Sequence, residues 1–290
     1  MNLSVAAARR PIPARTVRTR RIAFEYPPDE LPRHFAGGDL VMSHVVSVLS
    51  SMFPEGEDFF VRSVRHYRDE IVDPELKKQV AGFIGQEAMH GREHRAFNER
   101  LQALGFPTRK IDRLVKWGFQ LDEKVLPPHV QLAITAALEH YTATLAYVLL
   151  SDPEARAMID TDEVRSLLLW HALEESEHKS VAFDVFEEVS GSHRVRANVM
   201  RVVTVLFLGS VVLGTTASML VDPATRDLRR LRRSVAALRR SPWLTRSVRQ
   251  HIGDYNRRGF HPDDHDTSEV VARWRAELFG TDGTLAAKMK

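Results

Sequence analysis

The chain has 290 residues, of which 43% are hydrophobic and 27% charged, and its formal net charge is +3. This composition is typical of a globular protein with one large domain or two smaller ones. The sequence contains no cysteine, which excludes disulfides, thiolate zinc sites and thiol nucleophiles. A bound metal would therefore need His and carboxylate ligands. The excess arginines lie near the two ends of the chain rather than on a basic core, so we expect no nucleic-acid partner.

Residues 1–30 contain many arginines and several prolines but few apolar side chains. This composition predicts a flexible basic arm. A contact with a partner or membrane, or a packed extension, is the alternative. The N-terminus lacks the apolar core of a signal peptide, so we expect a cytoplasmic protein. Membrane association stays open because of an apolar segment further along the chain.

Helical periodicity begins at residue 39. Residues 39–53 form an apolar run that Asp39 can cap. Pro54 and Gly56 then predict a break, with a new helix from near Glu55.

Clear start and stop signals delimit the helices that follow. Asp73 followed by Pro74 predicts a helix start, Gly105 predicts a helix end, and Asp162 can cap a fourth core helix. No stretch shows convincing β alternation, so the sequence predicts an all-α protein. These helices are expected over about 74–104, 128–150 and 162–189, with a crossover at 108–128 that is helical in part.

Residues 202–221 carry no charged side chain and have arginines on both sides. At about 1.5 Å per residue, such a helix is about long enough to cross a bilayer, but arginines at both ends set no orientation. Its Gly, Ser and Thr residues also suit a helix packed tightly in a bundle. We expect a fifth helix on the bundle or at a subunit interface, which would make a homodimer. Membrane spanning, or contact of residues 202–240 with a membrane surface, is the alternative.

The remainder of the chain is polar and rich in arginine. Residues 226–258 predict one or two amphipathic surface helices, and residues 260–266 predict a polar turn. A last short helix is expected near 268–278.

A Glu-x-x-His pattern occurs twice in the predicted helices, from Glu87 to His90 and from Glu175 to His178. An offset of three places both side chains on one helix face. Two such pairs on separate helices, with one Glu from each of two further helices, are the ligand pattern of a dinuclear metal site in a four-helix bundle. The two further ligands would be Glu57 and Glu139.

The charges and surroundings of these residues support a metal site. Four glutamates would neutralise two ferrous ions, which makes their common burial tolerable. The two histidines would supply neutral nitrogen ligands suited to iron, manganese or zinc. Glu139 follows an apolar stretch, and a charge placed there is costly without a partner. Chance placement on solvated or otherwise satisfied faces is the alternative.

Neighbouring residues leave some choices open. Glu55 and Asp58 compete with Glu57, which we prefer because apolar residues share its face, and Glu174 competes with Glu175, which alone keeps the offset of three to its histidine. His171 lies one turn before Glu175 and is expected to be a seventh ligand. The alternative for His171 is a solvent-facing side chain or one that hydrogen-bonds a ligand. His94 is expected to hydrogen-bond a ligand or line a substrate pocket.

This order of ligands resembles that of the ferritin-like di-iron carboxylate superfamily. The His-x-x-x-Glu-x-x-His form is similar to the p-aminobenzoate N-oxygenase branch, in which a third histidine binds iron. Over roughly residues 35–260, the segments 54–60, 86–94 and 174–184 resemble a bacterial family called predicted metal-dependent hydrolases.

The resemblance implies a ferritin-like four-helix bundle with additional N- and C-terminal helices. It also implies a cofactor of two Fe ions, with Mn or mixed Fe/Mn as alternatives. The expected organisation is a basic flexible arm (1–30), a ferritin-like metal-binding domain (31–260) and a C-terminal helical tail (261–290).

Two enzymatic functions follow from such a site. We expect an oxidoreductase that activates O2 at two irons to oxidise a small organic substrate. The alternative is a metal-dependent hydrolase, in which paired metals generate a hydroxide nucleophile. Iron storage is a third possibility, and the hundred residues after the fourth core helix argue against it.

Overall fold

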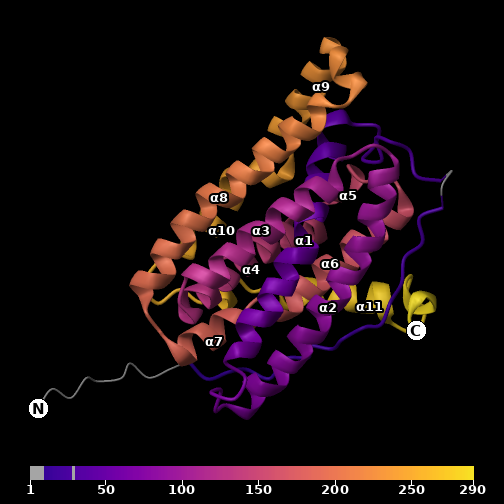
Figure 1. Cartoon of the computed structure of the whole chain (residues 1–290). Helices are drawn as coiled ribbons and strands as arrows, with labels where there is room; N and C mark the ends of the chain where they lie inside the picture. The colour runs from indigo at the N-terminus through magenta and orange to yellow at the C-terminus, as the bar shows by residue number, and fades with distance from the viewer. Residues whose placement is uncertain (1–9, 28–29) are drawn as a thin grey trace, which may run out of the picture.

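The computed structural model describes residues 10–27 and 30–290. Within these residues the fold is all-α, as predicted, and the only β pairing is an isolated bridge between Ile22 and Met289. Short 3-10 turns lie at Pro223–Arg226, Pro242–Leu244, Pro262–Asp264 and Ala286–Lys288. The α-helices are α1 (Leu40–His66), α2 (Pro74–Ala103), α3 (Thr108–Val125), α4 (Pro128–Ser151), α5 (Pro153–Ala157), α6 (Asp162–His178), α7 (Val181–Val189), α8 (His193–Leu220), α9 (Leu228–Arg239), α10 (Arg246–Asp254) and α11 (Ser268–Phe279) (Figure 1).

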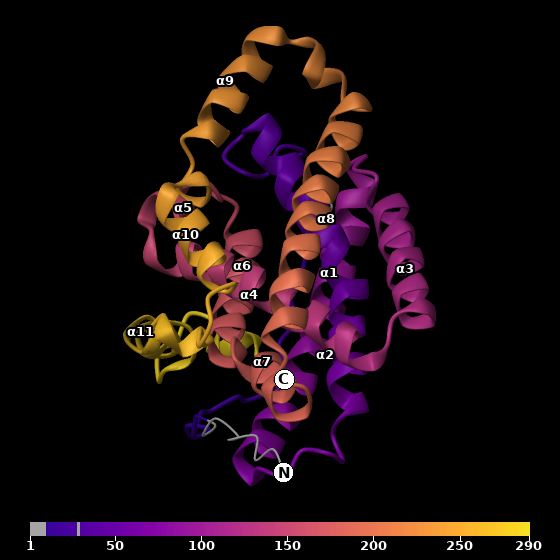
Figure 2. The same cartoon turned by 90° about the vertical axis from the view of Figure 1, so that its left-hand side faces the viewer.

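Four helical rods form the centre of the molecule. The helix α1 packs along α2, and α4 packs along α6 and its continuation α7. The helix α3 lies on the outer side of α1, while α8 runs along α1 and α4 (Figure 2). The predicted surface helices are present as α9 and α10, and the last predicted helix is α11, which packs on α6.

The apolar core consists of two clusters with a polar layer between them. On α2, Phe83 belongs to one cluster and Phe97 to the other, and both are fully buried. Glu87 and His90 lie between them along the same helix. The order on α6 and α7 is equivalent, because Trp170 belongs to one cluster and the α7 side chains to the other. The polar layer therefore lies in the middle of the bundle, far from either end.

The break predicted at Pro54 is wrong, because α1 continues through it to His66. A proline inside a helix removes the hydrogen bond to the carbonyl four residues earlier. That carbonyl belongs to Ser50, and the side-chain Nδ2 of Asn98 on α2 donates to it at 2.8 Å. The neighbouring helix thus satisfies the group that Pro54 leaves free, and the helix does not need to end.

The fourth core helix is shorter than predicted and ends at His178, with α7 as a separate segment. Between them, the Ser180 hydroxyl donates to Asp263 and the Lys179 ammonium donates to the backbone of the same turn. The predicted cap at the start of this helix also differs. Thr161 occupies the N-cap position instead of Asp162, and its hydroxyl donates to a backbone carbonyl near the start of α1.

Residues 10–27 lie along the bundle, which corrects the expectation of a flexible arm for this part of the chain. Ile22 and Phe24 are buried in the core. The close approach depends on two glycines of α2, because a Cβ at Gly82 would lie 2.1 Å from the Val17 carbonyl oxygen. A Cβ at Gly85 would likewise overlap the Thr19 side chain. Residues 1–9 and 28–29 fall outside the described part.

Helix α8 has one covered face and one open face, so a fully buried core helix is ruled out. It is long and apolar enough to cross a membrane by length and composition, yet only 17% of its most apolar window is buried. Met200 and Val203 pack into the core, whereas Leu206 and Leu213 are exposed. The predicted fifth helix is therefore present and packs on the bundle through one face, and its other face is exposed.

We expect Gly82→Val to displace the segment 10–27, because the new side chain overlaps the Val17 backbone. Forcing extra atoms into a packed contact typically costs about 1–3 kcal/mol. Limited trypsin digestion should cut faster at Arg18 and Arg21 in this variant than in the wild type. Gly118→Val on α3 is the matched control, since nothing lies within 4 Å of its Cβ position. Equal cleavage rates in all three proteins would contradict the proposed role of Gly82.

Candidate metal centre

The structure brings all seven predicted ligand residues together in the polar layer, and every one is buried. Each helix of the bundle contributes, and the three histidines all face the carboxylates. The residues are Glu57 from α1, Glu87 and His90 from α2, Glu139 from α4, and His171, Glu175 and His178 from α6.

The side chains form two overlapping groups that share Glu175 and Glu87. In the first, His178 Nε2 lies 3.1 Å from Glu87 Oε1, 3.3 Å from Glu139 Oε2 and 3.5 Å from Glu175 Oε1. The second group contains the other two histidines.

There, His171 Nε2 lies 3.0 Å from Glu175 Oε1 and 3.8 Å from Glu57 Oε1. His90 Nδ1 lies 3.5 Å from Glu175 Oε1 and 3.8 Å from Glu87 Oε1. Two overlapping groups of His and Glu ligands joined by Glu175 and Glu87 match the arrangement expected for a pair of ions.

A hydrogen bond from outside the centre determines which nitrogen of His178 faces the carboxylates. Gln86 donates through Nε2 to Glu177, which turns its Oε1 towards His178 Nδ1 at 2.9 Å. An amide oxygen only accepts, so Nδ1 of His178 carries the proton. Nε2 is therefore the nitrogen that faces the carboxylates and would bind a metal ion. Burial lowers the pKa of His178, but Glu175 and Glu139 raise it well above its usual value, so a metal ion would replace the proton on Nε2.

His90 is oriented in the same way by a carboxylate. Its Nε2 donates to Glu174 Oε2 at 3.1 Å, which leaves Nδ1 facing the centre. Burial raises the pKa of Glu174 to about 7 despite its contact with Arg20. Arg20 is itself buried, and it donates to both Glu174 and Glu177 at 2.8 Å. An arginine from the N-terminal segment thus balances Glu174, the partner of His90, and Glu177, the partner of Gln86.

A chain of hydrogen bonds sets the proton of His171. Asn98 accepts from the Ser50 hydroxyl at 2.7 Å, so Ser50 in turn accepts from His94 Nδ1 at 2.8 Å. His94 Nε2 then has a free lone pair and accepts from His171 Nδ1 at 2.7 Å. His171 Nε2 is left without a proton and faces Glu175. The predicted hydrogen-bonding role of His94 is therefore present, directed at His171.

Unsatisfied atoms in this centre test whether a metal fits. Among the described residues, the buried side-chain atoms that lack a hydrogen-bond partner include both oxygens of Glu57, Glu87 and Glu139, Oε2 of Glu175, Nδ1 of His90 and Nε2 of His178. Buried polar groups are normally paired, because an unpaired one costs about 1–3 kcal/mol. Carboxylate oxygens and imidazole nitrogens gathered without donors are suited to cations. The residues present therefore fit a metal centre.

Burial also shifts the protonation equilibria of the centre. Burial, together with the neighbouring carboxylates, raises the pKa of Glu57 and Glu87 well above the usual range and that of Glu139 to about 7. Burial and the nearby His171 lower the pKa of His90 and His94, so both imidazoles are neutral. Neutral histidines are the form that binds metal, and a cation would replace protons on the carboxylates.

A narrow apolar pocket reaches the centre from the side. Glu57 and Glu175 form part of its wall, and its volume is about 50 Å³. The other lining residues are Met52, Phe53, Gly56 and Phe60 of α1, Val115 and Phe119 of α3, Leu138 and Thr142 of α4, and Phe207 of α8. A small or slender apolar molecule could therefore approach the carboxylates without passing charged groups.

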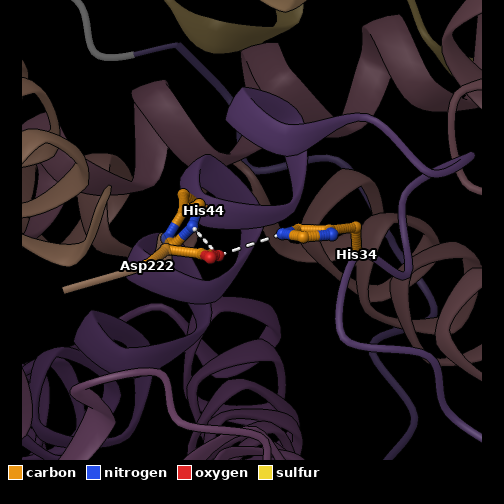
Figure 3. Close-up of side chains that lie close together, drawn as sticks. All are labelled: His34, His44 and Asp222. Atoms are coloured by element: carbon orange, nitrogen blue, oxygen red, sulfur yellow. Dashed lines mark hydrogen bonds and ion pairs between the residues drawn. The ribbon is translucent and has the colours of Figure 1, made fainter. Parts of the chain in front are cut away.

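A second cluster of potential ligands lies at the end of α8 and has a different character. Asp222 Oδ2 accepts from His34 Nε2 and from His44 Nε2, each at 3.0 Å (Figure 3). The remaining nitrogen of His44 accepts from Ser218, and that of His34 accepts from Arg230. Both nitrogens of each histidine are thus paired, and Arg230 contacts the ring of His34. We interpret this cluster as a clamp that holds the α8 terminus to α1.

Sequence reasoning missed the outer residues that orient the imidazoles. Arg20 lies in a segment whose composition predicts disorder, and Gln86 and Ser50 carry no motif. The face of α6 opposite the ligands offered a signal, since Glu174 and Glu177 are a second pair of carboxylates at an offset of three. Buried carboxylates of this kind require a cation or donor nearby.

Fold and site together define an all-α protein with a buried His/Glu centre suited to metal. Comparison with known protein families gives the same class. The family described as predicted metal-dependent hydrolases matches residues 18–266, and the chain belongs to this family. No curated protein and no solved structure matches the chain.

We expect Gln86→Leu to weaken metal binding by about 10–100-fold, the usual effect of removing a partner that orients a ligating histidine. The reason is that His178 loses the acceptor for its Nδ1 proton. Competition with a coloured chelator measures the affinity. Gln79→Leu is the matched control, because Gln79 is equally buried on α2 but bonds to Pro13 and Glu75. Unchanged affinity in Gln86→Leu, or an equal loss in both variants, would refute this role.

Proposed function

We propose that the protein is a metal-dependent hydrolase that acts at a dinuclear centre held by the seven residues of the polar layer. The observation that carries the proposal is the set of ligand atoms: three imidazoles whose inward nitrogens face four carboxylates, and seven of the eight carboxylate oxygens have no hydrogen-bond partner. Membership of the family supports the hydrolytic reading over the oxidative one. A pair of bound metal ions would lower the pKa of a water ligand and polarise the substrate.

The chain itself contributes binding, orientation and exclusion of water. Gln86, Glu174 and His94 hold the imidazoles in one tautomer each, so no reorganisation of ligands is needed during a reaction. The phenyl ring of Phe53 packs against both His94 and His171, and it closes the centre on the pocket side. The substrate would therefore be neutral and apolar next to the reacting group.

Oxidation of a small organic substrate with O2 is the second candidate. The observation in its favour is the third imidazole, His171, together with an apolar pocket in which O2 dissolves readily. The two candidates separate in one experiment. Reduced, anaerobic, iron-loaded protein is mixed with O2, and a transient visible absorption would favour oxidation. Hydrolysis of ester or amide probes under strictly anaerobic conditions would favour the hydrolase.

Metal content tests the ligand assignment directly. We expect about two metal ions per chain in the wild type, as in other carboxylate-bridged centres of helical bundles. Glu139→Ala and Glu175→Ala should each lose metal, because a ligand and its charge disappear together. Elemental analysis of freshly purified protein measures the ratio. Glu99→Ala provides the control, as Glu99 is exposed on α2. Full metal content in both ligand variants would sink the proposed centre.

His171→Ala should leave two metal ions in place while changing reactivity, because six ligands remain and one nitrogen donor is lost. His94→Phe keeps His171 but removes the acceptor for its Nδ1 proton, together with the bond between His94 and Ser50. We expect it to produce a smaller change in the same direction. Absorption spectra of the cobalt-loaded proteins report the number of nitrogen donors. Identical spectra for wild type and His171→Ala would place His171 outside the ligand set.

A further inference from the structure

The open face of α8 is a continuous apolar surface. Val202, Val205, Leu206, Val212 and Leu213 are all exposed and recur at helical spacing along one side. Leu213 is 72% exposed, although its residue type is normally buried. Large contiguous apolar patches on a protein surface mark sites of interaction with partners or membranes.

Helix α3 carries a second apolar stripe beside this face. Leu114, Trp117, Leu121 and Val125 are exposed and are spaced by three or four residues, so they share one side of the helix. Trp117 is 63% exposed. Tryptophan prefers the interface between water and lipid, where its ring is apolar and its N–H remains hydrated.

The pocket that leads to the metal centre lies between these two helices. Val115 and Phe119 of α3 line it on one side, and Phe207 of α8 lines it on the other. Helices α3 and α8 are each packed on α1, and Figure 2 shows them on either side of it. The route to Glu57 and Glu175 therefore begins within the apolar surface formed by the two helices.

The charges around this surface are predominantly positive. Helix α8 contains no acidic residue, and exposed Arg201 lies near its start while Arg226 follows its end. On α3, Arg113, Lys116 and Lys124 are exposed beside the apolar stripe, whereas Asp112, Asp122 and Glu123 are half-buried. Lys116 pairs with Glu55, and Glu123 pairs with Arg62. An apolar surface bordered by lysine and arginine is the pattern of helices that lie in the interface of an anionic membrane.

We propose that the exposed faces of α3 and α8 dock on an anionic lipid surface, so that the pocket opens into the bilayer. A second copy of the chain fits this surface less well. A twofold interface places each patch against itself, and the basic border would then meet its own charge. Lipid head groups supply the opposite charge instead.

The docking mode identifies a class of substrate for the proposed hydrolase, and this step rests on the proposed function. A pocket of about 50 Å³ that is narrow, apolar and open to lipid would accept only the end of a slender chain next to its polar group, and the rest of the hydrocarbon would stay in the bilayer. The substrate class is therefore a lipid-borne acyl ester or amide. A polar, water-soluble substrate would have to lose its hydration to pass the apolar lining of the pocket.

Vesicle flotation tests the docking surface with the full-length, metal-loaded protein. Vesicles of phosphatidylcholine with about 30% phosphatidylglycerol should carry the wild type, and raising the salt should weaken the binding. Neutral phosphatidylcholine vesicles should bind less. The double variant Trp117→Glu/Leu213→Glu places charge on both stripes and should bind at least about tenfold less. Its exposed positions keep the core intact, which thermal unfolding checks.

Val72→Glu is the matched control, because Val72 is 82% exposed but lies in the connection between α1 and α2. It should float like the wild type. Tryptophan emission adds a second readout, since a blue shift on adding vesicles should vanish in Trp117→Phe. A wild type that ignores both kinds of vesicle overturns the proposal. A second outcome would also overturn it: light scattering shows a dimer for the wild type and a monomer for the double variant, and neither protein binds vesicles.

Hydrolysis of short-chain and long-chain p-nitrophenyl esters tests the substrate class separately. The wild type should prefer long-chain ester presented in anionic vesicles, and the double variant should lose that preference. Gly56→Leu projects towards Phe119 and Phe60 in the pocket and should abolish long-chain hydrolysis with flotation unchanged. Preference for the short ester would overturn the substrate class. If neither ester is cleaved while vesicles still bind, the proposed function fails and the docking surface stands.

Discussion

Four buried carboxylates lie together at the centre of this bundle, and seven of their eight oxygens have no hydrogen-bond partner. The surrounding polar residues bond to the outer nitrogens of the histidines and not to these carboxylates. The carboxylates therefore need positive charge from another source. Such a cluster is unfavourable in an apolar core unless cations or protons neutralise it. The polar layer, its two apolar neighbours and its ring of hydrogen bonds all follow from that requirement.

The proline in α1 shows how far one local feature reaches. Pro54 frees the carbonyl of Ser50, and Asn98 crosses from α2 to satisfy it. The same amide directs the hydroxyl of Ser50, which directs His94, which directs His171. A residue that would end most helices thus anchors the chain of hydrogen bonds that orients one imidazole. The cost of a helix defect is offset by tertiary order at the site.

The seven residues of the centre could be predicted because their signal is local. Helical spacing puts each Glu-x-x-His pair on one face, and the apolar neighbours of Glu139 make an unpartnered charge there too costly. Other features depend on distant contacts that no spacing encodes. The segment 10–27 is ordered because glycines on α2 admit it. Pro54 sits inside a helix because Asn98 lies opposite it, and periodicity alone could not tell which face of α8 is covered.

Arg20 has a consequence for how the protein can be divided. Its guanidinium pairs with both Glu174 and Glu177, and Arg275 pairs with Glu177 as well. Glu174 accepts from His90, and Glu177 accepts from Gln86, which orients His178. Removing one partner from a buried ion pair typically costs about 3–5 kcal/mol. The family match begins at residue 18, only two positions earlier. A shortened chain that starts at the first core helix would keep all seven central residues and the pair between Arg275 and Glu177, but it would lose the arginine that balances Glu174, the partner of His90.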